Sequence, residues 1–155
     1  MTIGLVADTH GQFRASVTAA LAGVHLIVHA GDVGGTAVLA ALGGIARVEA
    51  VSGNVDDRHD PALPRERTLL LGGLTLHVSH GDELGSPKAD TLLARYDADV
   101  IVFGHTHKPL VFRSAEGRLV VNPGAAGPRR FHLQPSVARL TIADGRAEAE
   151  IIMLP

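Results

Sequence analysis

The stretch Val100-Ile101-Val102-Phe103-Gly104-His105-Thr106-His107 joins an apolar run to two histidines that lie two residues apart. The apolar run predicts a short buried strand. Gly104 permits a tight turn directly after it. In extended backbone, side chains two positions apart leave on the same face, so both imidazoles are expected to point at one spot beyond the strand. Because neutral imidazole is the commonest metal ligand, the pattern predicts part of a metal site; its alternative is two solvated histidines in a loop.

Composition narrows the classes of protein to which the chain can belong. With 155 residues, 46% of them hydrophobic and 19% charged, residues 1–155 are expected to form one globular domain. A formal charge of -2 and few aromatic side chains argue against a general nucleic-acid binder. The absence of cysteine excludes disulfides and thiolate zinc sites. No apolar run approaches the ~20 residues of a membrane span, and no basic leader is visible, so a cytoplasmic protein is expected.

Strand and helix patterns alternate along the first half of the chain, which predicts parallel pairing in an α/β layer. Helical spacing of apolar residues follows Phe13, Thr36 is expected to cap a second helix, and Ser86-Pro87 is expected to start a third. After Pro109 the pattern predicts antiparallel strands, with a hairpin turn at Asp144-Gly145. Besides the strand before Gly104, strands are expected at Ile3–Ala7, Leu26–Val28, Ala46–Val51, Thr68–Leu71, Leu74–Val78, Leu110–Arg113, Leu119–Val121, Val137–Ile142 and Ala147–Met153.

Five of the expected strands each end in a short polar turn that contains glycine. The turns are Asp8-Thr9-His10-Gly11, Gly31-Asp32, Gly53-Asn54, His80-Gly81 and Gly104-His105-Thr106-His107. Ligands of α/β sheets bind beyond the carboxyl ends of the strands. Two carboxylates, one amide and four imidazoles are too many for one tetrahedral metal and suit a pair. Oxygen and nitrogen ligands without sulfur fit manganese, iron, zinc, cobalt or nickel, and such a pair would attract a phosphate anion.

The series D-x-H, G-D, G-N-x-D, H-G and G-H-x-H, in this order, resembles the calcineurin-like metallophosphoesterase superfamily. The short length and Asn122-Pro123-Gly124 are similar to its compact prokaryotic phosphodiesterase branch, and the resemblance runs from Asp8 to about Gly124. It implies an α/β fold, a four-layer α/β/β/α sandwich of two mixed sheets flanked by helices. It also implies a ligand set, with Asp8, His10 and His107 on one metal, Asn54, His80 and His105 on the other, and Asp32 bridging both.

The same resemblance implies a phosphoester hydrolase that uses two divalent ions, with manganese ahead of nickel, cobalt, iron or zinc. A water or hydroxide that bridges the ions would attack phosphorus in line. Asp32, Asn54, His80 and His105 would be the catalytic residues. The expected partner is a small phosphoester, a small nucleotide included, and neither a membrane nor a nucleic-acid polymer is expected. A homo-oligomer stays open.

One position departs from the family pattern. In its phosphatase branches the residue after the asparagine is often a histidine that protonates the leaving oxygen, whereas here it is Val55. Asp56, which would orient that histidine, is expected to support the loop. An alkoxide leaves poorly without an acid, so the chain is expected to be a phosphodiesterase with a good or metal-assisted leaving group. A phosphomonoesterase or nucleotide pyrophosphatase is the alternative.

A further alternative is a non-catalytic scaffold, as in the retromer subunit that resembles a metallophosphoesterase. That interpretation predicts eroded ligands, and all seven ligand positions are kept here.

Outside the ligand set, Asn54 and four side chains in two loops are candidate substrate contacts. His59 and His132 are expected either to reach the substrate, as substitute acids, or to be solvated. Arg129 and Arg130 would hold a phosphate bidentately, or else belong to the ordinary surface.

Two more residues lie beside the ligands in the sequence. His29 is expected to be a hydrogen-bonded turn residue next to Gly31-Asp32. Asp82 is expected either to accept a hydrogen bond from His80 and so orient its ring, or to be an exposed acid in a turn.

Overall fold

The first of two β-sheets contains both the first strand and the last two strands of the chain. The computed structural model describes residues 1–130 and 132–155. Strands β1 (Thr2–Val6), β2 (Leu26–His29) and β3 (Val48–Ala50) pair in parallel, while β9 (Ser136–Ala143) joins β1 antiparallel and forms a hairpin with β10 (Arg146–Met153). The strand order is therefore β10-β9-β1-β2-β3. The predicted hairpin turn is confirmed, with φ of 53° at Asp144 and 72° at Gly145.

The second sheet also mixes parallel and antiparallel pairs. It contains β4 (Glu66–Leu71), β5 (Leu74–Ser79), β6 (Val100–Val102), β7 (Leu110–Arg113) and β8 (Leu119–Asn122), in the order β4-β5-β6-β8-β7. Strands β5, β6 and β8 run parallel, and β4 and β7 pair antiparallel at the two edges. Every strand of both sheets lies within two residues of the range that the sequence predicts.

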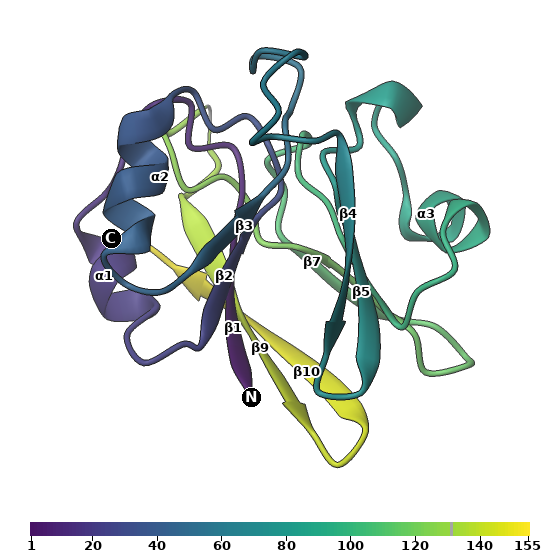
Figure 1. Ribbon diagram of the computed structural model, residues 1–155. Helices are drawn as coiled ribbons and strands as arrows, with labels where there is room; N and C mark the ends of the chain where they lie inside the picture. The colour runs from purple at the N-terminus through teal and green to yellow at the C-terminus, as the bar shows by residue number, and fades with distance from the viewer. Residues whose placement is uncertain (131) are drawn as a thin grey trace.

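The two sheets pack face to face, with helices on their outer sides (Figure 1). Ile3 and Leu5 of β1 pack against Leu76 and Val102 of the other sheet, whereas Val6 points to the outer side, where the helices lie. This alternation follows from the two-residue period of a strand. Helices α1 (Ser16–Ala20) and α2 (Thr36–Gly43) cover the first sheet, and α3 (Ala89–Arg95) covers the second. The predicted four-layer α/β/β/α sandwich is confirmed.

Two predicted helix starts are wrong. Thr36 is the first helical residue of α2 rather than its cap, because Gly35 occupies the cap position with a φ of 139° that favours glycine. Helix α3 begins at Ala89, two residues beyond the predicted Ser86-Pro87 start. Pro87 is buried beside Gly81 and Phe103 instead, in the connection that precedes the helix.

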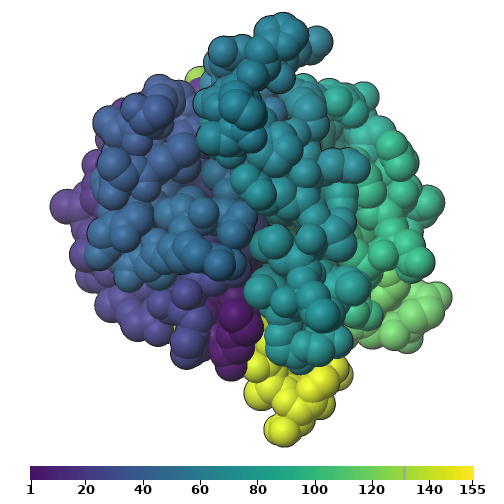
Figure 2. Space-filling view, viewed as in Figure 1, coloured from purple at the N-terminus to yellow at the C-terminus, as the bar shows by residue number. Residues whose placement is uncertain are grey.

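The carboxyl ends of β1, β2, β3, β5 and β6 meet at one edge of the sandwich. The N–H of Asp8 donates to the carbonyl of Gly31, and the N–H of Gly104 to that of His80, each at 3.0 Å. Residues 51–65, which follow β3, rise above this edge between the two halves of the molecule (Figures 1 and 2). Among the described residues, no helix has the length and apolar character that crossing a membrane requires.

Candidate metal centre

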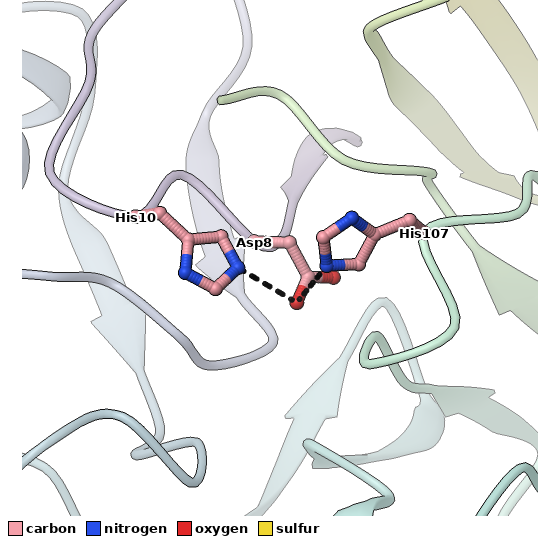
Figure 3. A group of neighbouring side chains, drawn as sticks. All are labelled: Asp8, His10 and His107. Carbon is pink, nitrogen blue, oxygen red and sulfur yellow. Dashed lines mark ion pairs between the residues drawn. The ribbon is translucent and has the colours of Figure 1, made fainter. Parts of the chain in front are cut away.

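Six of the seven predicted ligands gather into two neighbouring groups at this edge. Asp8, His10 and His107 form one group, and each of them offers a ligand atom within 4.8 Å of the others. Figure 3 shows both imidazoles of this group directed at one carboxylate oxygen of Asp8. The second group, with the same spacing, consists of Asp32, His80 and His105. The structure thus joins side chains that the sequence separates by as much as 99 residues, from Asp8 to His107.

The two histidines of the opening stretch do not share one spot, contrary to the expectation from extended backbone. His107 lies with Asp8 and His10, whereas His105 lies beside His80, with ring centroids 5.1 Å apart. The reason is local, because φ is 68° at His105 and 63° at His107, in the left-handed region. The backbone turns after each histidine and sends the two rings to adjacent groups.

Left-handed backbone is concentrated at this centre. Six non-glycine residues of the described chain have a positive φ, and five of them are Asp8, His10, Asp32, His105 and His107. Such conformations cost about 1 kcal/mol or more each and persist only where the surrounding structure imposes them. Their coincidence with the predicted ligands supports a functional role for this edge of the sandwich.

Asp32 lies between the two groups. Its Oδ2 is 3.6 Å from Nε2 of His10 and 3.2 Å from Nε2 of His80, so the carboxylate faces a histidine of each group. Asp8 Oδ1 lies 3.3 Å from Nε2 of His107 and 3.8 Å from Nε2 of His10. Within residues 1–130 and 132–155, neither Asp8 Oδ1 nor the Nε2 atoms of His10 and His80 have a hydrogen-bond partner, although all three are buried. Unpartnered buried polar atoms that face one another fit a bound cation.

A backbone carbonyl sets the tautomer of His80. Nδ1 of His80 lies 2.8 Å from the carbonyl oxygen of Ala30, which can only accept a hydrogen bond, so Nδ1 carries the proton. In the neutral ring the lone pair is then on Nε2, the nitrogen that faces Asp32. Of the two alternatives for Asp82, orientation of His80 is not the one observed, because the Asp82 carboxylate pairs with Arg65 at 3.2 Å.

The carboxylates and imidazoles of the centre perturb each other's proton affinity. Burial by itself raises the pKa of Asp32, but the His80 ring and the backbone N–H of Val55 outweigh it and lower that pKa to about 2. Burial lowers the pKa of His10 by more than Asp32 and Asp8 raise it. For His80 the balance is reversed, because Asp32 and Asp8 raise its pKa despite burial. An ionised Asp32 is the state that a metal ion requires.

Hydrogen bonds of the buried His29 side chain connect the turn of Asp8 to the turn of Asp32. It is fully buried at the end of β2, where its Nδ1 accepts the N–H of Gly31 at 3.1 Å. Its Nε2–H therefore donates to Oγ1 of Thr9 at 2.9 Å, and the Thr9 hydroxyl donates to the carbonyl of Val33. Burial lowers the pKa of His29 to about 4. The expected hydrogen-bonded turn residue is confirmed, and it holds the turns of Asp8 and Asp32 together.

The turn that carries Asn54 is pressed against Asp32. A Cβ on Gly53 would lie 2.1 Å from Asp32 Oδ1, and the N–H of Val55 donates to that same oxygen at 3.0 Å. Asn54 lies between Gly53 and Val55 in the chain and is exposed. Asp56 accepts three backbone N–H groups, from Val33, Gly34 and Gly53. The expectation that Asp56 supports the loop is confirmed.

One of the four candidate substrate contacts in the loops lines a cavity beside the centre. This cavity, about 250 Å³ in volume, is lined by His105, Thr106, His107, Lys108, Arg130 and Leu133. Arg130 also lowers the pKa of His10, as a nearby cation does. Arg129, His59 and His132 are exposed and are not among the described residues that line it. The sequence reasoning missed Lys108, whose place directly after His107 was the available signal.

Residues 1–145 match the calcineurin-like phosphoesterase superfamily domain. The chain belongs to this superfamily. A probable metallophosphoesterase of Methanothermobacter thermautotrophicus is 37% identical over an alignment of 162 positions, which covers 98% of this chain and 92% of that protein. A probable metallophosphoesterase of Methanocaldococcus jannaschii is 35% identical, and the alignment covers 98% of this chain and 81% of that protein. Family membership places the chain among the metal-dependent phosphoester hydrolases.

Solved structures of the same fold include several proteins named Vps29. Vps29 of Chaetomium thermophilum has a TM-score of 0.80 at 18% identity, with 100% of both chains covered. Vps29 of Entamoeba histolytica, in complex with zinc, has a TM-score of 0.77 at 21% identity, with 99% of both chains covered. At these identities the likeness shows the shared sandwich of sheets and helices.

Proposed function

We propose that this metallophosphoesterase is a phosphodiesterase with a dinuclear centre, manganese being the first metal to test. Asp8, His10 and His107 would hold one ion, Asn54, His80 and His105 the other, and Asp32 would bridge them. Two ions so held would supply a nucleophile at neutral pH and neutralise the phosphoryl oxygens. The observation that carries the proposal is the position of Asp32 Oδ2, within 3.6 Å of Nε2 of His10 and 3.2 Å of Nε2 of His80.

The other residues of the chain would bind and orient the phosphoryl group. Asn54 is exposed beside Asp32 and would donate its amide N–H to a phosphoryl oxygen. Arg130 and Lys108 line the cavity beside His105 and His107, and their charges would attract an anionic ester. These three residues would place the phosphorus of the ester over the centre.

The preference for a diester rests on the missing acid. Val55 is 52% exposed at the position from which a histidine would protonate a leaving alkoxide, and its side chain has no proton to give. Asp56 is occupied by three backbone N–H groups. A substrate whose leaving group needs little protonation is therefore favoured, and an alkyl phosphomonoester is disfavoured.

A scaffold role is the second candidate, because proteins named Vps29 share the fold. All seven ligand positions are kept in this chain, and five non-glycine residues of the centre hold a positive φ. A pure scaffold needs neither feature. This contrast supports hydrolysis.

The test is hydrolysis of bis(p-nitrophenyl) phosphate and p-nitrophenyl phosphate by chelator-stripped protein. Manganese, nickel, cobalt, zinc and magnesium are added back in turn, and Asp32→Asn is the matched variant. We expect metal-dependent turnover of the diester, weak turnover of the monoester, and loss of at least about 100-fold in kcat/KM in the variant.

Other results would change the proposal in defined ways. Preference for the monoester would contradict the argument from Val55 and direct attention to His59 or His132. Two bound ions per chain without turnover of either ester would favour the scaffold. Failure of the wild-type protein to bind metal would remove the centre itself.

A further inference from the structure

A second and larger cavity adjoins the centre. It has a volume of about 580 Å³, within the range of small-molecule sites. Its apolar surface comes from Pro87, Ala89, Phe103, Pro109 and Leu110, and the rest of its lining from Ser86, Lys88, Thr106 and Lys108. We call it the lysine cavity.

The lysine cavity adjoins the smaller cavity at the candidate centre. Thr106 and Lys108 line both this cavity and the smaller one that contains His105 and His107. These two residues are held in place, because Asn122 Nδ2 donates to Thr106 Oγ1 at 3.0 Å, and that oxygen also accepts the N–H of Lys108 at 3.3 Å. Thr106 and Lys108 therefore lie between the two cavities, and a ligand that reaches past them from the centre would occupy the lysine cavity.

The charge of the cavity is of one sign. Lys88 and Lys108 are the two lysines of the whole chain, and both line this one cavity. The ion pairs of the described residues are formed by arginine and histidine side chains, so neither ammonium group is neutralised by a carboxylate. No acidic residue of the described chain lines the cavity. The exposed ammonium groups of Lys88 and Lys108 and the apolar lining beside them are together complementary to a flat group that carries a negative charge.

We propose that the lysine cavity holds one substituent of a phosphodiester substrate, a ring-bearing group with a negative charge of its own, as in a nucleoside phosphate. The inference rests on the proposed phosphodiesterase function and adds its substrate class. Pro109 and Leu110 contact the ring, while Lys88 and Lys108 bind the distal anion. The reacting phosphorus lies over the centre, on the other side of Thr106.

Three p-nitrophenyl diesters with the same leaving group test this assignment. The retained group is methyl phosphate, thymidine 5′-phosphate, or thymidine 3′,5′-bisphosphate esterified at its 5′-phosphate. We expect kcat/KM to rise by about tenfold from the methyl to the thymidine ester, because the ring fills the cavity. A further rise of about tenfold is expected for the bisphosphate, because its second anion meets the lysines. Equal values for all three esters would overturn the proposal.

Two variants separate the contributions of ring and charge. Ser86→Trp places an indole in the cavity from an exposed position, and we expect it to bring the thymidine-to-methyl ratio of kcat/KM close to one. Lys88→Glu reverses a charge that lines only this cavity, and it should remove the advantage of the second phosphate. Arg95→Glu makes the same change of charge at the exposed far end of α3 and should alter neither ratio. If Arg95→Glu also brought both ratios of kcat/KM close to one, the effects of the other two variants would not be specific to the lysine cavity.

A binding measurement keeps the inference independent of turnover. Thymidine 3′,5′-bisphosphate is titrated into metal-free wild-type, Lys88→Glu and Arg95→Glu proteins by calorimetry, with circular dichroism to confirm folding. Binding that weakens about tenfold in Lys88→Glu alone supports the lysine cavity, even if no ester is hydrolysed and the proposed function fails. Equal affinity in all three proteins, or no binding to the wild type, overturns it.

Discussion

The ring of His80 donates a hydrogen bond of 2.8 Å from Nδ1 to the carbonyl oxygen of Ala30. His80 follows β5 of the second sheet, and Ala30 follows β2 of the first, so the bond crosses from one sheet to the other. In the neutral ring it leaves the lone pair on Nε2, which faces Asp32 at 3.2 Å. The second ligand group is therefore complete only when the two sheets are packed together, which couples metal binding to folding.

That coupling predicts a metal-dependent stability. Adding manganese to chelator-stripped protein at about 100 times its dissociation constant should raise the free energy of unfolding by about 2.7 kcal/mol. For a chain of this size the midpoint of thermal unfolding would rise by about 5–10 °C. Asp32→Asn should lose most of the increase, because its amide faces both groups without a charge. A thermal scan that is identical with and without metal would contradict the prediction.

The close contact of Gly53 with Asp32 predicts a steric effect. In Gly53→Ala the new Cβ would lie 2.1 Å from Asp32 Oδ1 and 2.3 Å from its backbone nitrogen, so both must move. We expect a loss of about 1–3 kcal/mol in stability, together with weaker metal binding. Gly43→Ala is the matched control, because nothing lies within 4 Å of the added Cβ at the end of α2. Chemical denaturation and metal titration measure the two effects. Normal metal affinity in Gly53→Ala would mean that the turn tolerates a shift.

Val55 offers a gain of function. Its side chain is exposed while its N–H is fixed to Asp32, so a new imidazole can enter without loss of that hydrogen bond. Val55→His should raise kcat/KM on an alkyl phosphomonoester by about 100-fold, the lower end of what a general acid supplies. Val55→Asn is the control, because it is polar but is not an acid at neutral pH. No gain in the histidine variant would show that this position does not serve the leaving group.

Burial of neutral His29 predicts a dependence of stability on pH. Its pKa is about 4 in the folded protein against 6.5 when exposed, so the unfolded chain binds more protons between these values. Stability should therefore fall as the pH drops from about 6.5 to 4, by about 2 kcal/mol between pH 7 and pH 4.5 for this residue alone. His29→Gln, which keeps a polar group near Thr9, should lack this contribution. Denaturation of metal-free protein across the pH range gives the difference, and parallel curves for the two proteins would contradict it.

The sequence by itself determined the strands, the fold class and the candidate ligands. Buried runs such as Ile3–Ala7 and the Asp144-Gly145 turn are local signals, and the structure follows them to within two residues. The turns with candidate ligands could also be recognised from the sequence. Each consists of aspartate, asparagine or histidine close to a glycine at the end of an apolar run, which is a local pattern. The predicted helix starts at Thr36 and Ser86 were wrong. The positive φ of Gly35 places the cap one residue before Thr36, and the packing of Pro87 beside Gly81 and Phe103 delays the third helix.

Only the tertiary structure shows why the two histidines of the H-x-H pattern part. An H-x-H pattern in extended backbone predicts one common target, but the left-handed φ at His105 and His107 sends the rings to two groups. The tautomer of His80 depends on Ala30, and Asp82 pairs with Arg65, 17 residues away, rather than with its neighbour. These outcomes depend on contacts between residues far apart in the chain, whose geometry is fixed only when the two sheets pack.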